Sequence, residues 1–180
     1  VYKRQNRDRH LGAMYNNPEW MTDAPEFEDT NFMLSALNAY GVLEDDSTKR
    51  WAKAFLIAPA IRVIFELSLL ALDKSCDEIH LPNIGVSAKH KENVSYVHRL
   101  FKNNKFQDYL QAGRIVFDTY QEAHSVIENT DFGESVEYSS LGSHKSMKDY
   151  DIDTIMRLSN DAVLFAMLCQ QYVQFKKQGV

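Results

Sequence analysis

Cysteine is scarce in this chain, whose 180 residues include only Cys76 and Cys169. The two thiols are far apart in the sequence, and neither belongs to a Cys-x-x-Cys pair or a cysteine–histidine cluster. These absences exclude a disulfide-rich scaffold and a structural zinc site. We expect both cysteines to be small buried hydrophobes on helices.

The short motifs of several enzyme classes are missing too. No Gly-x-Gly-x-x-Gly or Walker-type run is present, which excludes an NTPase and a dinucleotide-binding domain. Without a Gly-x-Ser-x-Gly elbow, nothing indicates a serine hydrolase. The chain also has no Glu-x-x-His pair of the kind that di-iron bundles carry on two helices. We therefore expect no metal and no organic cofactor.

Uncharged runs long enough to cross a membrane are also lacking. The longest apolar stretch, residues 55–72, carries Arg62 and Glu66 near its middle, where charge is most unfavourable in a bilayer. No apolar signal-peptide segment follows the charged N-terminus. We expect a soluble, cytoplasmic protein with no membrane partner. Residues 1–5 resemble a translated sequencing adapter, so residues 1–10 are assigned no function.

Size and composition allow one good-sized core. A chain of 180 residues with 44% hydrophobic side chains is expected to form a single domain, over residues 31–180. Residues 1–30 are expected to form an irregular N-terminal segment. The net charge of −5 argues against a protein that coats nucleic acid, and leaves room only for a local basic surface.

Helical periodicity predicts an all-α fold. A short leading helix precedes four main helices in the predicted bundle, at residues 32–43, 48–75, 87–104, 106–128 and 151–177. Pro59 should kink or split the first main helix, because proline removes a helical hydrogen bond. Residues 129–150 are poor in apolar side chains and are expected to form a long loop. On the last helix, Asp153, Arg157 and Asp161 are expected to form an outward ladder of charges.

The most distinctive feature is the charged pair Arg62 and Glu66 within an otherwise apolar helix. The two residues are four apart, so they share one helix face. A helix that is apolar all round is expected to be buried all round, which places the pair in or beside the core. Buried charges must be paired, and the pair is either structural or the wall of a site. In a site, Arg114 and His144 are the expected partners, since arginine and histidine on one phosphodiester suit metal-independent RNA cleavage.

The predicted helix over residues 87–104 carries several basic side chains along its length, among them Lys89, Lys91, Arg99 and Lys102. Its His90 and His98 lie eight residues apart and therefore project in similar directions. With the lysines and arginines around them they are candidates for phosphate binding, and the residues selected are Lys91, His98 and Arg99. The competing interpretation is a solvated helix face, which is the more common reason for such a run.

Two motifs of the chain resemble a known family. Ala60-Ile-Arg-Val-Ile-Phe-Glu66 resembles the Arg-x-x-x-Glu helix in an uncharacterised branch of bacterial HEPN-like domains. Tyr138-Ser-Ser-Leu-Gly-Ser-His144 is similar to a Tyr-x-x-Leu-Ser-like stretch of that branch, which ends in histidine just before the long final helix. The resemblance covers about residues 48–178. The usual catalytic signature, arginine followed after four to six residues by histidine, is missing from this stretch.

The resemblance implies a helical bundle that forms a homodimer and acts on RNA or nucleotides in a defence or stress system. Some members of the family are ribonucleases, and others only bind nucleotides or proteins. It implies a site with Arg62 and His144 as catalytic residues, supported by Glu66, Tyr138 and Arg114. The alternative is a non-catalytic interaction or dimerisation domain that uses an apolar helix face. A bundle that binds a small molecule under the loop of residues 129–150 is a third possibility.

Overall fold

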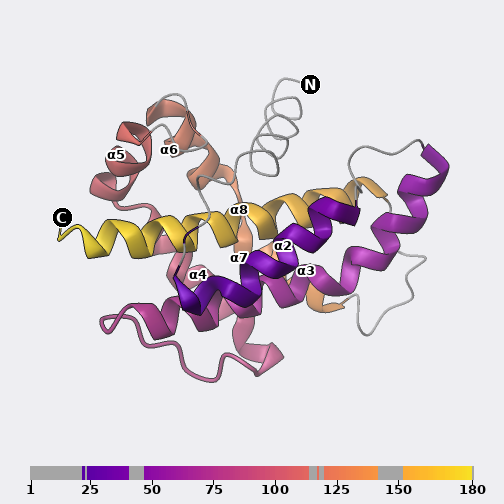
Figure 1. Ribbon diagram of the computed structural model, residues 1–180, viewed down its shortest axis with the longest axis horizontal. Coiled ribbons are helices and arrows are strands. Elements are labelled where there is room, and N and C mark those ends of the chain that lie inside the picture. The colour runs from indigo at the N-terminus through magenta and orange to yellow at the C-terminus, as the bar shows by residue number, and fades with distance from the viewer. Residues whose placement is uncertain are drawn as a thin grey trace.

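The computed structural model describes residues 22, 24–40, 47–113, 117, 120–141 and 152–179. Within these residues the secondary structure is entirely helical, which confirms the all-α prediction (Figure 1). In the described part of the chain, one short 3-10 helix precedes seven α-helices: η2 (Pro25–Phe27), α2 (Glu28–Tyr40), α3 (Ser47–Ser75), α4 (Ser87–Phe101), α5 (Asn104–Ala112), α6 (Tyr120–Asn129), α7 (Phe132–Leu141) and α8 (Ile152–Lys177).

The centre of the fold is the packing of α3 against α8. The rings of Phe65 and Phe165 lie 5.1 Å apart, and Lys176 Nζ near the end of α8 lies 2.7 Å from Oε2 of Glu78, which follows the end of α3. The two helices therefore run in the same direction, as the colour gradient in Figure 1 shows. Parallel neighbours cannot be joined by a short turn, so the chain between them must cross back. Helices α4 to α7 make that return.

Phe165 joins four helices in the core. Its ring centre lies 5.1 Å from that of Phe65 on α3, 5.8 Å from Phe101 on α4 and 5.5 Å from Phe132 on α7. Ring pairs at these separations add about 0.5–1.5 kcal/mol each to the stability that comes from burial alone. All residues of α8 from 161 to 173 are buried, so this helix is the central helix of the core.

Helix α7 corrects the prediction of a loop over residues 129–150. Residues 132–141 are helical, and Phe132 and Val136 are fully buried. The helix begins with a side-chain cap, because Asp131 Oδ1 accepts a hydrogen bond of 2.9 Å from the backbone N–H of Glu134. The segment has few apolar residues, but the ones it has are spaced to face the core.

Helices α4 and α7 run antiparallel and approach closely. Lys91 Nζ lies 2.6 Å from Glu137 Oε2, and one helical turn further on Gly133 faces Ser95. A Cβ atom added to Gly133 would lie only 2.6 Å from Ser95 Oγ. A glycine here therefore sets how near the two helices can come.

The predicted single helix over residues 106–128 is wrong. Helix α5 ends at Ala112, and α6 begins at Tyr120. Gly113 is the C-cap residue of α5, and its backbone N–H donates to the carbonyl oxygen of Tyr109 at 3.1 Å. At its start, Asn103 Oδ1 accepts hydrogen bonds from the N–H groups of Lys105 and Phe106, and this cap separates α5 from α4.

Other predicted boundaries differ less from the structure. Helix α3 continues without a break through Pro59, so the predicted split does not occur. The leading helix begins at Glu28 rather than at residue 32, within the segment that was expected to be irregular. The final helix lies where the periodicity placed it. No helix in the described part of the chain is long and apolar enough to cross a membrane.

A closed hydrogen-bond triad fastens the N-terminal segment to α8. The buried Gln170 Oε1 accepts from the backbone N–H of Thr22 at 3.0 Å, and its Nε2 donates to Asn31 Oδ1 at 2.7 Å. Asn31 Nδ2 in turn donates to the carbonyl of Thr22 at 3.2 Å. Because a buried amide is unfavourable unless its hydrogen bonds are made, Gln170 fixes how η2 and α2 dock.

We expect Gly133→Ala to depend on the hydroxyl of Ser95. In the wild-type background the added methyl group must displace Ser95 Oγ, which offsets the roughly 1 kcal/mol that alanine gains over glycine in a helix. In a Ser95→Ala background the same change should raise the free energy of unfolding by about 1 kcal/mol. Denaturant unfolding of the four proteins gives the coupling energy. Equal effects of Gly133→Ala in both backgrounds would contradict the close approach.

Candidate functional site

Arg62 and Glu66 lie at the boundary of the core. Each side chain is 28% exposed, and Arg62 Nη2 is 3.9 Å from Glu66 Oε2. The expectation that α3 is buried all round is wrong, because Val63 and Leu70 are 37% and 36% exposed. The helix packs one face on α8 and leaves the opposite face open, so the charged pair sits where the two faces meet.

His90 of α4 is the second neighbour of Glu66. This histidine is buried, and its Nε2 lies 3.9 Å from Glu66 Oε2 and 2.6 Å from the carbonyl oxygen of Ile84. A carbonyl only accepts, so Nε2 carries the proton that it donates to Ile84. Nδ1 is buried and has no hydrogen-bond partner among the residues that the structure describes. No sequence pattern predicts this contact, since α3 and α4 meet only in the tertiary structure.

The positive charges of α4 are each placed beside an acid or a ring. Lys91 pairs with Glu137 of α7 at 2.6 Å, and the Arg99 guanidinium lies over the Tyr96 ring, 5.8 Å from its centre. Two further ion pairs are Lys89 with Glu92 at 2.7 Å and Lys102 with Glu128 at 2.9 Å. This geometry favours the solvated-face interpretation, because acids compete with phosphate for the lysines. Phosphate binding by Lys91 and Arg99 stays a prediction.

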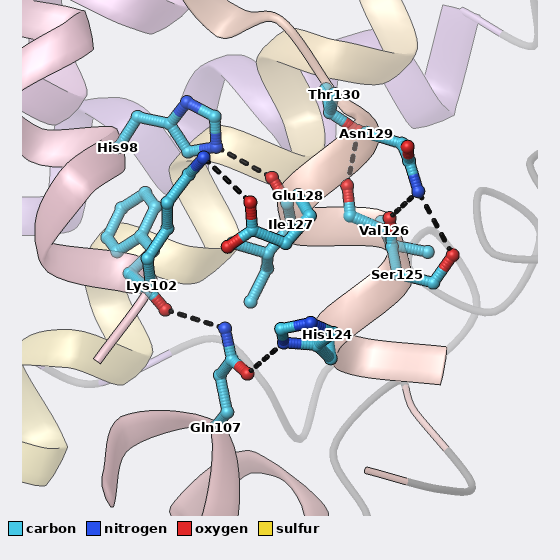
Figure 2. A network of polar contacts seen from close by, with 11 residues as sticks. His98, Lys102, Gln107, His124, Ser125, Val126, Ile127, Glu128, Asn129 and Thr130 are labelled. Atoms are coloured by element: carbon cyan, nitrogen blue, oxygen red, sulfur yellow. Dashed lines mark hydrogen bonds and ion pairs between the residues drawn. The ribbon is translucent and has the colours of Figure 1, made fainter. Parts of the chain in front are cut away.

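His98 is an anchor between α4 and α6 (Figure 2). Its Nε2 donates to the carbonyl oxygen of Ile127 at 2.7 Å, and its ring meets the edge of Phe132 at 5.0 Å. Burial is the main cause that lowers the pKa of His98, and the positive charge of Lys102 lowers it further. The hydrogen bond to Ile127 acts in the opposite direction. One ring nitrogen of His98, which was selected as a phosphate-binding residue, is thus already bonded to the backbone.

A second histidine extends this network across three helices. Gln107 of α5 donates from Nε2 to the carbonyl of Phe101 at 3.4 Å, which turns its Oε1 toward α6. That oxygen lies 2.9 Å from His124 Nδ1, as Figure 2 shows. Because the amide oxygen only accepts, His124 donates from Nδ1. The contact fixes the tautomer of an exposed histidine and ties α5 to α6.

The remaining predicted site residues are only partly placed. Tyr138 lies on α7 and is 42% exposed, next to Glu137, the partner of Lys91. Arg114 and His144 lie outside the described residues. The structure therefore joins Arg62, Glu66 and His90 on one side of the bundle, and whether His144 completes a site stays a prediction.

A buried carboxylate was missed by the sequence patterns. Asp161 was expected on the outside of the last helix with Asp153 and Arg157, but it is only 3% exposed. Ser135 Oγ of α7 donates to Asp161 Oδ2 at 2.7 Å. The reason for the error is that α8 is covered on all sides in this region, which the pattern of one helix cannot reveal.

Neither protein-family models, nor curated proteins, nor solved structures match this chain. The resemblance to HEPN-like domains therefore rests on its short motifs alone. Within the part of the chain that the structure describes, no group of three or more histidine, cysteine, aspartate or glutamate side chains is arranged to hold a metal ion.

The low pKa of His98 predicts how stability responds to acid. The unfolded chain binds a proton at this residue near pH 6.5, whereas the folded protein binds it only at lower pH. The contribution of neutral His98 to the free energy of unfolding is therefore complete above about pH 7.5. It is lost progressively as the pH falls from about 6.5 through the lower pKa of the folded protein. His98→Gln keeps a donor for Ile127 but cannot titrate. We expect its free energy of unfolding to fall less between pH 7.5 and about 5.5 than that of the wild type.

Urea unfolding at four or five pH values in this range measures the effect. His80→Gln, on the exposed loop before α4, controls for the removal of a histidine. Equal pH slopes for His98→Gln and the wild type would show that His98 does not carry this linkage.

Proposed function

We propose that this domain is a protein-interaction module that binds through the outer face of α3. This face consists of residues on the side of α3 that points away from α8: Pro59, Arg62, Val63, Glu66, Leu67 and Leu70. The observation that carries the proposal is the exposure of Val63 and Leu70, two turns apart, with Leu67 partly exposed between them.

The spacing of these residues makes a continuous stripe. Positions 59, 63, 67 and 70 are separated by three or four residues, so their side chains line one side of the helix. The inner face, which includes Ile61, Ile64, Phe65 and Leu69, is almost fully buried and supplies the core. Apolar side chains on the outer face add little to folding, and a row of them rimmed by charges is typical of a binding surface.

Among the residues whose side chains the structure describes, the other exposed large apolar residues are Phe32, Val86 and Tyr138, which lie on or beside different helices and form no such row. Phe32 of α2 is 75% exposed, but the next exposed residues along its face are Ser35 and Ala36. A single exposed hydrophobic side chain is normal on a protein surface. The lysines on α4 and at its C-terminal end are paired with acids, which makes α4 less suited to bind phosphate. The outer face of α3 is therefore the better candidate for a binding surface.

A photo-crosslinking residue in place of Val63 tests this function. We expect discrete cross-linked products in the purified protein or in extract of cells that produce it. Added unlabelled wild-type protein should compete for the products, whereas a Val63→Ser/Leu70→Ser variant of verified fold should compete at least tenfold less well. The matched control places the same group at Phe32, which is more exposed. Products that are equally abundant from both positions, or that the variant displaces equally well, would exclude the outer face of α3 as a binding surface.

Metal-independent RNA cleavage is a second candidate, favoured by the partial exposure of Arg62. Its contact with Glu66 is 3.9 Å, longer than a strong charge-assisted hydrogen bond, so the guanidinium is not sealed in the core. This candidate predicts RNA cleavage that persists in EDTA and falls on the order of 100-fold or more in Arg62→Ala and in His144→Ala. Gel assays of mixed labelled RNAs measure it. Absence of cleavage by the wild type would remove this candidate.

A further inference from the structure

We propose that the partner of this surface is a second copy of the chain, docked with the two α3 helices antiparallel and Arg62 of each copy beside Glu66 of the other. The inference rests on the proposed binding function of the outer face of α3. It follows from the order of the charges and apolar residues on that face, which is complementary to itself under two-fold symmetry.

The two charges lie on the same flank of the exposed stripe. Arg62 and Glu66 are one helical turn apart, and both fall on the side of the stripe that borders α4, where Glu66 meets His90. In an antiparallel helix pair related by a two-fold axis, like flanks face each other across the interface. Arg62 of one copy then meets Glu66 of the other, and symmetry produces the contact twice.

The register that joins these charges also aligns the apolar side chains. When Arg62 stands opposite Glu66 of the second copy, Val63 stands opposite Leu67 and Pro59 opposite Leu70. No apolar position of the stripe is left without an apolar position facing it. A parallel pair would instead bring the charged flank against the opposite flank, which carries Ala60, and would leave both charges unpaired in the interface.

The existing contact between the two charges is weak enough to be exchanged. At 3.9 Å it is about 1 Å longer than a charge-assisted hydrogen bond, and both side chains are partly solvated. A partly exposed intrahelical pair of this kind contributes little to stability. In the dimer each charge keeps its neighbour and gains an opposite charge from the second copy, in a setting with less water.

The size of the face sets the expected affinity. One helix stripe of this length lies at the low end of the range of specific interfaces, so we expect a dissociation constant on the order of micromolar. Sedimentation velocity from about 1 to 200 μM should therefore show a concentration-dependent shift from monomer to dimer.

Charge substitutions provide the decisive test. Arg62→Glu gives a chain with two acids on the flank, and Glu66→Arg gives a chain with two bases. We expect each variant alone to dimerise at least tenfold more weakly than the wild type. An equimolar mixture of the two should form heterodimers with near wild-type affinity, because every cross pair is then acid against base. The double variant Arg62→Glu/Glu66→Arg should recover the homodimer.

Three outcomes would overturn the pairing. A wild-type protein that stays monomeric at 200 μM would exclude the second copy as partner, and the cross-linking test at position 63 would still decide the binding function. Dimerisation that Val63→Ser/Leu70→Ser abolishes but the charge variants leave unchanged would exclude the proposed register. A mixture of the two charge variants that stays monomeric would do the same.

A cysteine pair tests the same register without changing any charge, in case a charge variant unfolds. Val63→Cys mixed with Leu67→Cys should join with a short thiol-to-thiol cross-linker more efficiently than either variant alone. Cys76 and Cys169 are buried and compete little for the reagent. Efficient cross-linking within Val63→Cys alone, but not in the mixture, would contradict the proposed alignment.

Discussion

The burial of α8 against α3 is the constraint on which the rest of this structure depends. From residue 161 to residue 173 the helix has no exposed side, so every polar group there must be satisfied inside the protein. Gln170 is satisfied by the N-terminal segment, and Asp161 accepts from Ser135 of α7. The apolar positions converge on Phe165, which contacts rings from three other helices. Thus both the polar and the apolar residues of one helix determine where its neighbours dock.

The same packing explains which charges the domain leaves available. Because α3 and α8 run parallel, α4 to α7 must return along the bundle, and this brings Glu137 of α7 beside Lys91 of α4 and Glu128 of α6 beside Lys102 at the end of α4. Part of the positive charge of this helix is thereby paired by the fold itself. On the outer face of α3, Val63 and Leu70 remain exposed, and the charged pair beside them is 3.9 Å apart. The domain therefore presents an apolar stripe with one charge of each sign beside it.

Three histidines connect segments of the fold through their ring nitrogens. His90, His98 and His124 are bonded to Ile84, Ile127 and Gln107, and each contact links two segments of the chain. Sequence spacing correctly placed His90 and His98 on one helix, but it could not show that their ring nitrogens face backbone carbonyls. A histidine on a basic helix looks the same in sequence whether it meets solvent or the next helix. The partner decides its role.

The sequence by itself determined the all-α class, the position of α8 and the presence of a charged pair within α3, because periodicity and helix propensity are local properties. It also contained the caps at Asn103, Gly113 and Asp131, although only the structure showed that they end or begin helices. The tertiary structure alone decided that residues 132–141 fold as a helix, that Asp161 is buried and that one side of α3 is exposed. Burial depends on what the rest of the chain places against a helix, and a single helix pattern does not contain that information.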